Sequence, residues 1–285
     1  MNEAEHELYQ LKKYTHLATG FECLDVMKGL TTEDFLVISG DTGSGKSTVA
    51  LAMACNIAKK GNTVVYLNAE NSQKVIVDAI KGLGFNFDRD FGEYKKGVHR
   101  LIIYSMNDIK FESLEKLLIL HEPKALFIDL FSSLLDNQPT FLTSQLTAEY
   151  AKKISFMPQK YNCAIIATEQ FNKDNKRIAR PNIGDIAGGA GLSRKATKVL
   201  LIYRLIKTKA ESIMNRAANQ TVTEHSLTIA DISSELIVKK DRLGFWKDGF
   251  FPIKYVWQEG FSVLVGAELA DYKQLAFPSL IGGKK

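Results

Sequence analysis

Short apolar runs alternate with amphipathic segments along most of the chain. Each run is continuous and rich in β-branched or aromatic residues, which is typical of strands buried on both faces. The predicted strands are Phe35–Ser39, Thr63–Asn68, Leu101–Ser105, Ala125–Asp129, Cys163–Thr168, Val199–Arg204 and Leu236–Lys240. The predicted helices between them are Lys46–Lys60, Ser72–Lys81, Phe111–His121 and Thr143–Lys160. This order predicts an α/β fold in which helices cover both faces of a mostly parallel, twisted sheet.

The two ends of the chain have a different character. The tail from Phe245 to Val265 is aromatic and punctuated by glycine, which predicts an antiparallel extension at the sheet edge. The polar stretch Ile206–Ser233 has no periodicity that assigns a structure or a function. Residues 1–16 are expected to form either a short helix with Ala4, Leu8 and Leu11 on one face or a frayed end, and residues 17–285 a single α/β domain.

Composition excludes several classes of protein. Of 285 residues, 45% are apolar and 24% charged, the balance of an ordinary globular chain. No apolar run approaches the roughly 20 residues that cross a bilayer, and the polar amino terminus does not resemble a signal peptide. The cysteines are too separated for a disulfide framework or a metal cluster, so we expect Cys23, Cys55 and Cys163 in the core. The expected location is the cytoplasm, away from membranes.

The charge is concentrated in one segment. Between Lys173 and Lys209 ten Lys or Arg residues stand against two Asp residues, which leaves about −3 for the rest of a chain whose net charge is +5. A basic segment on an acidic body indicates a site for a polyanion such as a nucleic acid backbone. A solvated basic loop explains the same composition equally well.

A phosphate-binding motif follows the first long predicted strand and leads into the first long predicted helix. Its sequence, GDTGSGKS, matches G-x-x-x-x-G-K-[ST]. The glycines let backbone N–H groups surround phosphate oxygens, and the helix amino terminus adds positive potential. We expect Lys46 to contact the β and γ phosphates of ATP and the Ser47 hydroxyl to ligate Mg²⁺. The predicted nucleotide ligands are Gly40, Asp41, Thr42, Gly43, Ser44, Gly45, Lys46, Ser47 and Thr48.

Four further polar residues lie at or just after the ends of predicted strands, at the same sheet edge. Asp129 is expected to hold the water shell of Mg²⁺. Glu70 is expected to polarise the attacking water, although an acid there also suits the start of the next helix. Gln170 is placed to sense the γ-phosphate, and Glu169 beside it competes for that role.

These motifs, in this order, resemble the RecA-like motor domain of DnaB-like replicative helicases and phage primase–helicases. The resemblance covers Leu17–Val265 and rests on an ordered set: TGFECLD with Gly29-Leu30, the phosphate loop, Glu70, Asp129, QFNK at Gln170–Lys173, Arg180-Pro181 with Gly188–Leu192, and VKKDRLG at Val238–Gly244. It implies a RecA-like P-loop fold. It also implies that Lys240 and Arg242 reach the γ-phosphate bound by a neighbouring subunit. One departure is the basic Ser193-Arg194-Lys195, where such proteins often carry acids.

In a ring of such subunits, the loops after Ala125–Asp129 and Cys163–Thr168 would face the central channel. We expect sequence-independent contacts to single-stranded DNA phosphates from Lys173, Lys176, Arg177, Arg180, Arg194 and Lys195. Lys198, Arg204, Lys207 and Lys209 are expected to be surface charges, although Arg204 ends a strand and could equally pair with a carboxylate. Trp246 and Trp257 are expected to be core residues rather than base-stacking ones.

The resemblance implies an ATP hydrolase that assembles as a hexameric ring, moves along single-stranded DNA and unwinds duplex DNA in replication. A primase or loader acting in trans is an expected partner. Two alternatives stay open: a RecA-like recombinase or recombination mediator, and a nucleotide-gated regulatory ATPase that binds DNA without unwinding it. A small-molecule kinase is disfavoured, because the Lys240–Arg242 segment lies too far downstream for a lid.

Overall fold

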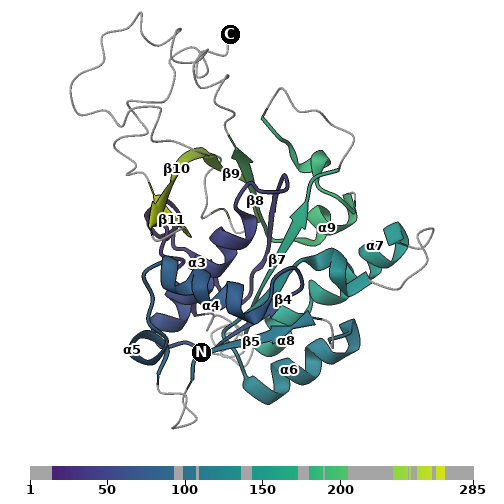
Figure 1. The fold of residues 1–285 in the computed structure, drawn as a ribbon. Helices are drawn as coiled ribbons and strands as arrows, with labels where there is room; N and C mark the ends of the chain where they lie inside the picture. The colour runs from purple at the N-terminus through teal and green to yellow at the C-terminus, as the bar shows by residue number, and fades with distance from the viewer. Residues whose placement is uncertain are drawn as a thin grey trace, which may run out of the picture.

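The computed structural model describes residues 15–92, 99–106, 109–135, 143–172, 180–188, 190–204, 234–242, 244, 249–258 and 261–266. The strands of its main sheet are β3 (Phe35–Gly40), β4 (Val64–Asn68), β5 (Leu101–Ser105), β6 (Ala125–Asp129), β7 (Ala164–Gln170), β8 (Lys198–Arg204), β9 (Ser234–Asp241), β10 (Gly249–Gln258) and β11 (Phe261–Gly266). In the described residues these nine strands lie in the order β11-β10-β9-β8-β3-β7-β6-β4-β5 (Figure 1). A small separate sheet pairs β1 (His16–Leu17) with β2 (Leu30–Thr31).

The sheet has a parallel part and an antiparallel part. Strands β8, β3, β7, β6, β4 and β5 run parallel to one another, whereas β9, β10 and β11 follow β8 in antiparallel pairs. Every predicted strand is present within a residue or two of its expected bounds. The predicted α/β class and the antiparallel extension formed by the aromatic tail are therefore confirmed.

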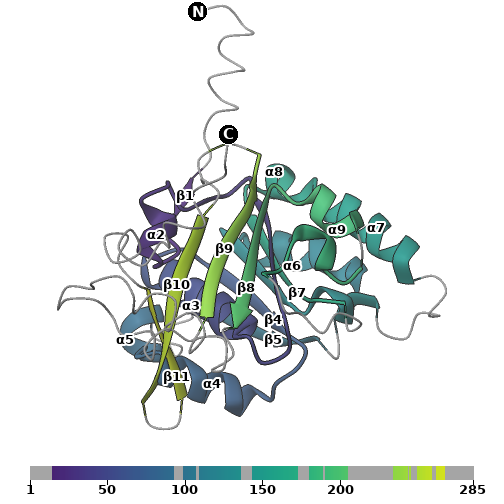
Figure 2. The same ribbon diagram turned by 90° about the horizontal axis from the view of Figure 1, so that it is seen from above.

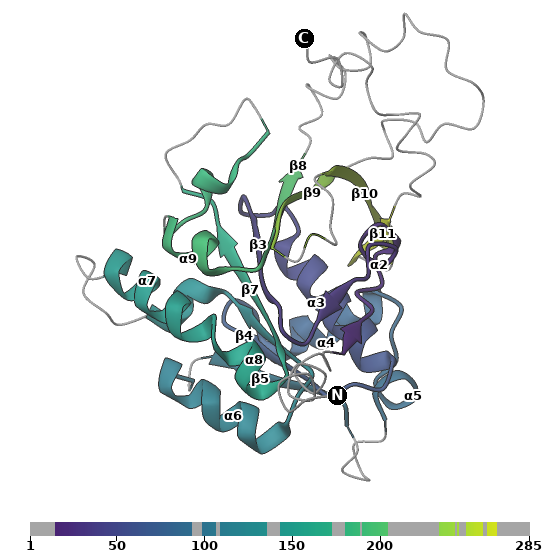
Figure 3. The same ribbon diagram turned by 180° about the vertical axis from the view of Figure 1, so that it is seen from behind.

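Helices cover both faces of the parallel part, as predicted (Figures 2 and 3). One face carries α2 (Glu22–Asp25), α3 (Lys46–Lys59), α4 (Gln73–Gly82) and α5 (Phe87–Phe91). The other carries η3 (Phe111–Ser113), α6 (Leu114–His121), η4 (Phe131–Leu135), α7 (Thr143–Ile154), α8 (Met157–Tyr161) and α9 (Ala190–Lys195), with the short turn η6 (Ile183–Asp185) before α9. Successive strand residues alternate between the two cores, so Leu36 and Ile38 pack towards α3 while Phe35 and Val37 pack on the opposite side.

The helix predicted over Thr143–Lys160 is in fact two helices. Helix α7 ends at Ile154, and α8 begins at Met157 with Pro158 in its first turn. Proline lacks the N–H for the bond to residue 154 and its ring crowds that carbonyl, so the chain starts a new helix here. Gly61, by contrast, follows α3 in the left-handed region (φ 97°), as expected for a residue that ends a helix.

Lys198 is not the surface charge that the sequence predicts. Its side chain is fully buried, and its ammonium lies 2.8 Å from Asp241 Oδ1 and 3.7 Å from Asp34 Oδ2. Strand β8 is an interior strand, and its register places Lys198 opposite Asp241. The two carboxylates supply the partners without which a buried lysine would be costly.

The cysteine prediction is confirmed, because all three thiols are buried and free of disulfides. Within the described ranges, no helix combines the length and the apolar character needed to cross a membrane. The expectations for residues 1–14, Ile206–Ser233 and Trp246 lie outside the described residues, and so does the side chain of Trp257.

Candidate functional site: a phosphate loop and its carboxylates

The phosphate loop occupies the position that its motif requires, between the central strand β3 and helix α3. Gly43 (φ 72°) and Gly45 (φ 97°) adopt left-handed conformations that favour glycine. At Gly40, a Cβ atom would lie 2.8 Å from the carbonyl oxygen of Ile202 in the neighbouring strand, so only glycine fits. The backbone of this loop can therefore curl around a phosphate at the amino end of α3.

Lys46 is buried against the loop, with 6% of its surface exposed. Its ammonium donates a hydrogen bond to the carbonyl oxygen of Asp41 over 3.0 Å. Burial lowers the pKa of Lys46, while the charges of Glu70, Asp129, Glu169 and Asp41 oppose that change. The predicted phosphate ligand, magnesium carboxylate and general base thus lie within electrostatic reach of one another.

Asp129, at the end of β6, accepts hydrogen bonds from three side-chain hydroxyls. The donors are Ser47 Oγ at 3.1 Å, Tyr66 OH at 2.8 Å and Thr168 Oγ1. Burial and the charge of Asp129 raise the pKa of Tyr66 well above its usual value, so its hydroxyl stays a donor. Sequence reasoning missed Tyr66 and Thr168, although a hydroxyl inside an otherwise apolar strand signals a buried partner.

The pair Ser47 and Asp129 fits a magnesium ion. A hydroxyl and a carboxylate are the hard oxygen donors that Mg²⁺ prefers, and the ion usually keeps water and phosphate oxygens as its other ligands. Within the described residues, no group of three or more His, Cys, Asp or Glu side chains could hold a metal on its own. The donor set therefore suits an ion that arrives with a nucleotide.

Glu70 lies in an exposed turn between β4 and α4, not in the helix. Asn68 holds this turn by accepting a hydrogen bond from the N–H of Asn71 at 3.2 Å and donating one to its carbonyl oxygen. Helix α4 begins at Gln73 and is capped by Ser72, so the alternative in which Glu70 starts the helix does not apply. The carboxylate is solvent-exposed beside the site, where a water-polarising group would have to be.

Gln170 ends β7 directly opposite Gly40 of the phosphate loop. The N–H of Phe171 continues the pairing with a hydrogen bond to the Gly40 carbonyl. The two carboxylate oxygens of Glu169 accept hydrogen bonds from the backbone N–H groups of Gln170 (2.7 Å) and Ser132 (2.9 Å), and its charge also acts on Lys46. Of the two candidates for a γ-phosphate sensor, Gln170 is the one that pairs with the phosphate loop in the sheet.

The basic residues predicted to contact DNA are only partly described. Lys173, Lys176 and Arg177 lie outside the described residues. The guanidinium of Arg180 forms a bidentate pair with the buried carboxylate of Glu235, at 2.8 and 2.7 Å. This pairing offsets the charge of Arg180 and connects Arg180 to strand β9.

Lys240 and Arg242 lie close to two other predicted DNA ligands, Arg194 and Lys195, which end helix α9. The ammonium of Lys240 donates to the carbonyl oxygens of Ser193 (2.7 Å) and Arg194 (3.2 Å), and the guanidinium of Arg242 also donates to the Arg194 carbonyl. Burial and the charge of Arg242 lower the pKa of Lys240 to about 8. The two cations therefore cap the carboxyl end of α9, a helix that sequence reasoning did not predict.

The sheet register separates these cations from the phosphate loop of the same chain. Lys240 pairs with Val199, whereas Gly40 pairs with Ile202, three positions further along β8. At 3.3 Å per residue this is roughly 10 Å along the sheet. Lys240 also binds α9, which packs on the face opposite α3.

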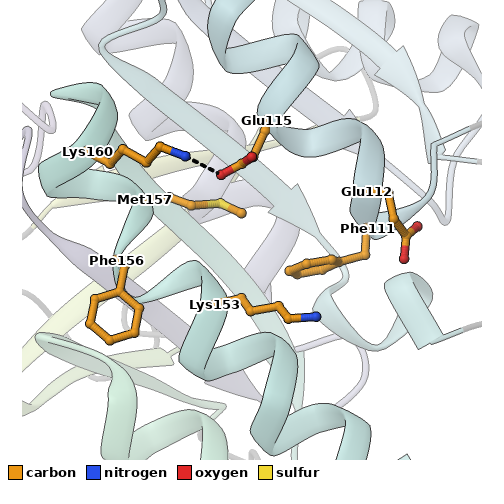
Figure 4. A pocket seen from close by; sticks show the side chains of 7 residues that line it. All are labelled: Phe111, Glu112, Glu115, Lys153, Phe156, Met157 and Lys160. Atoms are coloured by element: carbon orange, nitrogen blue, oxygen red, sulfur yellow. Dashed lines mark hydrogen bonds and ion pairs between the residues drawn. The ribbon is translucent and has the colours of Figure 1, made fainter.

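A pocket of about 480 Å³ lies apart from these residues, between η3 and α6 on one side and α7 and α8 on the other (Figure 4). A pair between Lys160 and Glu115 (2.9 Å) crosses it. Its lining contains none of the predicted site residues: Phe111, Glu112, Glu115, Lys153, Phe156, Met157 and Lys160.

The chain resembles several solved structures over most of its length. The ATPase domain of G40P matches with a TM-score of 0.64 at 18% identity, covering 92% of this chain and 96% of that one. A DnaB-like replicative helicase, in a structure that describes its interactions with primase, matches with a TM-score of 0.64 at 19% identity over 92% of this chain and 66% of that one. The KaiC-like protein PH0186 of Pyrococcus horikoshii OT3 matches with a TM-score of 0.60 at 15% identity over 88% and 99%.

Two relatives that are similar in sequence are named as DNA repair proteins. The DNA repair and recombination protein RadB of Methanobrevibacter smithii is 26% identical over 174 residues, which are 56% of this chain and 69% of RadB. The DNA repair protein RadA of Campylobacter jejuni is 36% identical over 69 residues, only 24% of this chain and 16% of RadA. The profile of a family described as an AAA domain matches residues 9–176, more than half of the chain. The chain therefore belongs to this AAA domain family and has the RecA-like P-loop ATPase fold.

Proposed function

We propose that this chain is an ATP-driven motor that assembles as a hexameric ring, moves along single-stranded DNA and unwinds duplex DNA. In this proposal Lys46 and the phosphate loop bind ATP, and Ser47 and Asp129 hold Mg²⁺. Glu70 polarises the attacking water, and Gln170 responds to the γ-phosphate. The carboxylate at the sheet edge and the loop lysine lie within electrostatic reach of each other, which supports hydrolysis at this site.

The observation that supports the proposal is the distance between the phosphate loop and the cations Lys240 and Arg242 within one chain. The loop, the magnesium ligands and Glu70 lie at the carboxyl edge of the parallel strands. Lys240 and Arg242 lie roughly 10 Å further down the sheet and on the α9 face. An arginine that stabilises the transition state must touch the γ-phosphate. The geometry therefore favours an arrangement in which Lys240 and Arg242 contact the nucleotide bound by a neighbouring subunit. A ring of subunits would bring these groups together.

A second candidate follows from the similarity to the recombination protein RadB. A recombinase or recombination mediator on the same fold would pair or anneal strands and would form filaments instead of closed rings. Strand-annealing and unwinding assays on the same substrate separate the two candidates. A primase or loader in trans remains part of the first proposal only.

The test is the ATPase rate with and without single-stranded DNA, together with mass measurement in the presence of a non-hydrolysable ATP analogue. The motor proposal predicts that DNA raises turnover several-fold and that the analogue produces a closed hexamer. A slow rate unaffected by DNA, from a monomer, contradicts it and favours a nucleotide-gated regulatory ATPase.

A further inference from the structure

The end of β9 that carries Lys240 and Arg242 pairs with β8 through a bulge. The residues that lie opposite one another there are Lys198 with Asp241, Val199 with Lys240, and Leu200 with Val238. This register passes over Lys239, so β9 contains one more residue than β8 at this point. An extra residue in one strand reverses the side of the sheet to which the later residues of that strand point.

The bulge decides which side of the sheet receives the two cations. Val238 packs in the core on the α3 side, and in a regular strand Lys240 would point to that side too, because side chains alternate. Instead the ammonium of Lys240 binds carbonyl oxygens of α9, on the opposite side. The guanidinium of Arg242 binds the same helix end. Both cations therefore reach α9 because of the bulge.

A buried ion pair lies directly beside the bulge. The side chains of Lys198 and Asp241 have no exposed surface, and the ammonium lies 2.8 Å from the carboxylate. Asp34, also buried, lies 3.7 Å from the same ammonium. Next to this pair, the backbone N–H of Arg242 donates to the carbonyl oxygen of Thr197 at 2.9 Å. The backbone that carries Arg242 is thus bonded to the start of β8.

The ion pair distinguishes the bulged register from a regular one. Without the bulge, Lys240 and not Asp241 would lie opposite Lys198. Two ammonium groups would then face each other on the buried side, and like charges opposite one another destabilise a sheet. Buried ion pairs add little net stability, but their best-attested use is to specify register.

We propose that Lys198 and Asp241 are positioning residues, whose pairing selects the bulged register and so directs Lys240 and Arg242 to the α9 side. This inference rests on the proposed function, because Arg242 has a part in hydrolysis only in that proposal. The register itself can be measured without any reference to hydrolysis.

Two variants and a matched control test the pair in the full chain. Asp241→Ala removes the carboxylate opposite Lys198. Lys198→Met with Asp241→Leu, the apolar pair, replaces both charges by side chains that also favour burial opposite one another, so it should restore the register. Glu235→Gln is the control, because Glu235 is a buried carboxylate at the other end of β9 that pairs with Arg180.

The first readout is hydrogen exchange of the Arg242 backbone N–H, measured by NMR with the amides of β3 as an internal reference. Exchange at Arg242 should be slow in the wild type, in the apolar pair and in Glu235→Gln. In Asp241→Ala it should be at least about tenfold faster, while the β3 amides keep their wild-type rates.

The second readout is ATP turnover without DNA. Asp241→Ala should bind ATP with wild-type affinity and lower kcat by about 10²-fold, the usual effect of misplacing a catalytic group. The apolar pair and Glu235→Gln should keep the wild-type kcat. In an Arg242→Ala background, Asp241→Ala should lower kcat no further, because it acts through Arg242.

Each outcome supports or overturns the inference. Slow exchange at Arg242 in Asp241→Ala overturns it, and so does fast exchange in the apolar pair or in Glu235→Gln. A further loss of kcat in the Arg242→Ala background overturns the positioning role. If Asp241→Ala does not fold, exchange in the apolar pair decides the question. If Arg242→Ala alone keeps the wild-type kcat, the proposed shared site fails, and hydrogen exchange alone decides whether the pair selects the register.

Discussion

At the residue scale, the proposed mechanism gives Lys46 the binding of phosphate and Glu70 the activation of water. Lys46 is buried, lies within the curve of the phosphate loop and donates to the loop backbone. Glu70 is exposed in a turn held by Asn68, and its charge acts on Lys46 without a direct bond to it. Removing either side chain should therefore stop ATP turnover, in one case by loss of ATP binding and in the other by loss of the group that polarises water.

The first prediction compares Lys46→Ala with Glu70→Gln. Lys46→Ala should lose ATP affinity and hydrolysis together, since the cation that neutralises the phosphates is gone. Glu70→Gln should bind ATP like the wild type and lower kcat by about 10²–10⁴-fold, the usual contribution of a general base. Nucleotide binding by calorimetry and turnover by phosphate release check both. Loss of ATP binding in Glu70→Gln would assign that residue a structural role.

At the element scale, the strands were predictable because burial on both faces leaves a continuous apolar run, as in Ala125–Asp129. The phosphate loop was predictable because its motif places glycine where the backbone has to curl around a phosphate. The burial of Lys198 was not predictable, because its partners Asp34, just before β3, and Asp241, at the end of β9, are far away in sequence and meet it only in the folded sheet. Helix α9 has six residues, too few to show a helical period.

The basic segment after β7 carries the second prediction. Each phosphate contact in single-stranded DNA should contribute about 0.7 to the slope of log affinity against log salt. Lys176→Ala with Arg177→Ala should flatten this slope by roughly one to two units. The slope is measured by fluorescence anisotropy of a labelled oligonucleotide at several salt concentrations.

A matched control removes the same charge elsewhere. Lys116 and Lys152 are exposed on α6 and α7, and their joint replacement by Ala should leave the slope unchanged. Arg180→Ala should affect the slope less than Lys176→Ala, because Glu235 already offsets its charge. An unchanged slope in the Lys176/Arg177 variant moves the DNA site elsewhere, with Arg194 and Lys195 as the next candidates.

At the scale of the whole molecule, the two groups of residues proposed to form the catalytic site lie apart. The proposed nucleotide ligands lie where the parallel strands end, and Lys240 and Arg242 lie where the antiparallel β9 ends. Helix α9 holds both cations through its carboxyl-terminal carbonyls. The proposed nucleotide-binding residues and the two cations therefore lie at different edges of the chain. This arrangement favours a catalytic site formed by the phosphate loop of one subunit and the cations of its neighbour.

The most direct test mixes two inactive variants. Arg242→Ala should bind ATP almost normally and hydrolyse it about 10³–10⁵-fold more slowly, the effect of a transition-state arginine. Lys46→Ala subunits keep Arg242, so mixed rings contain some sites with an intact loop from one subunit and an intact arginine from the next. The ATPase rate of the mixture, measured where subunits exchange and mass measurement detects mixed oligomers, should recover well above that of either variant alone. A mixture that stays inactive while mixed oligomers form contradicts the shared site.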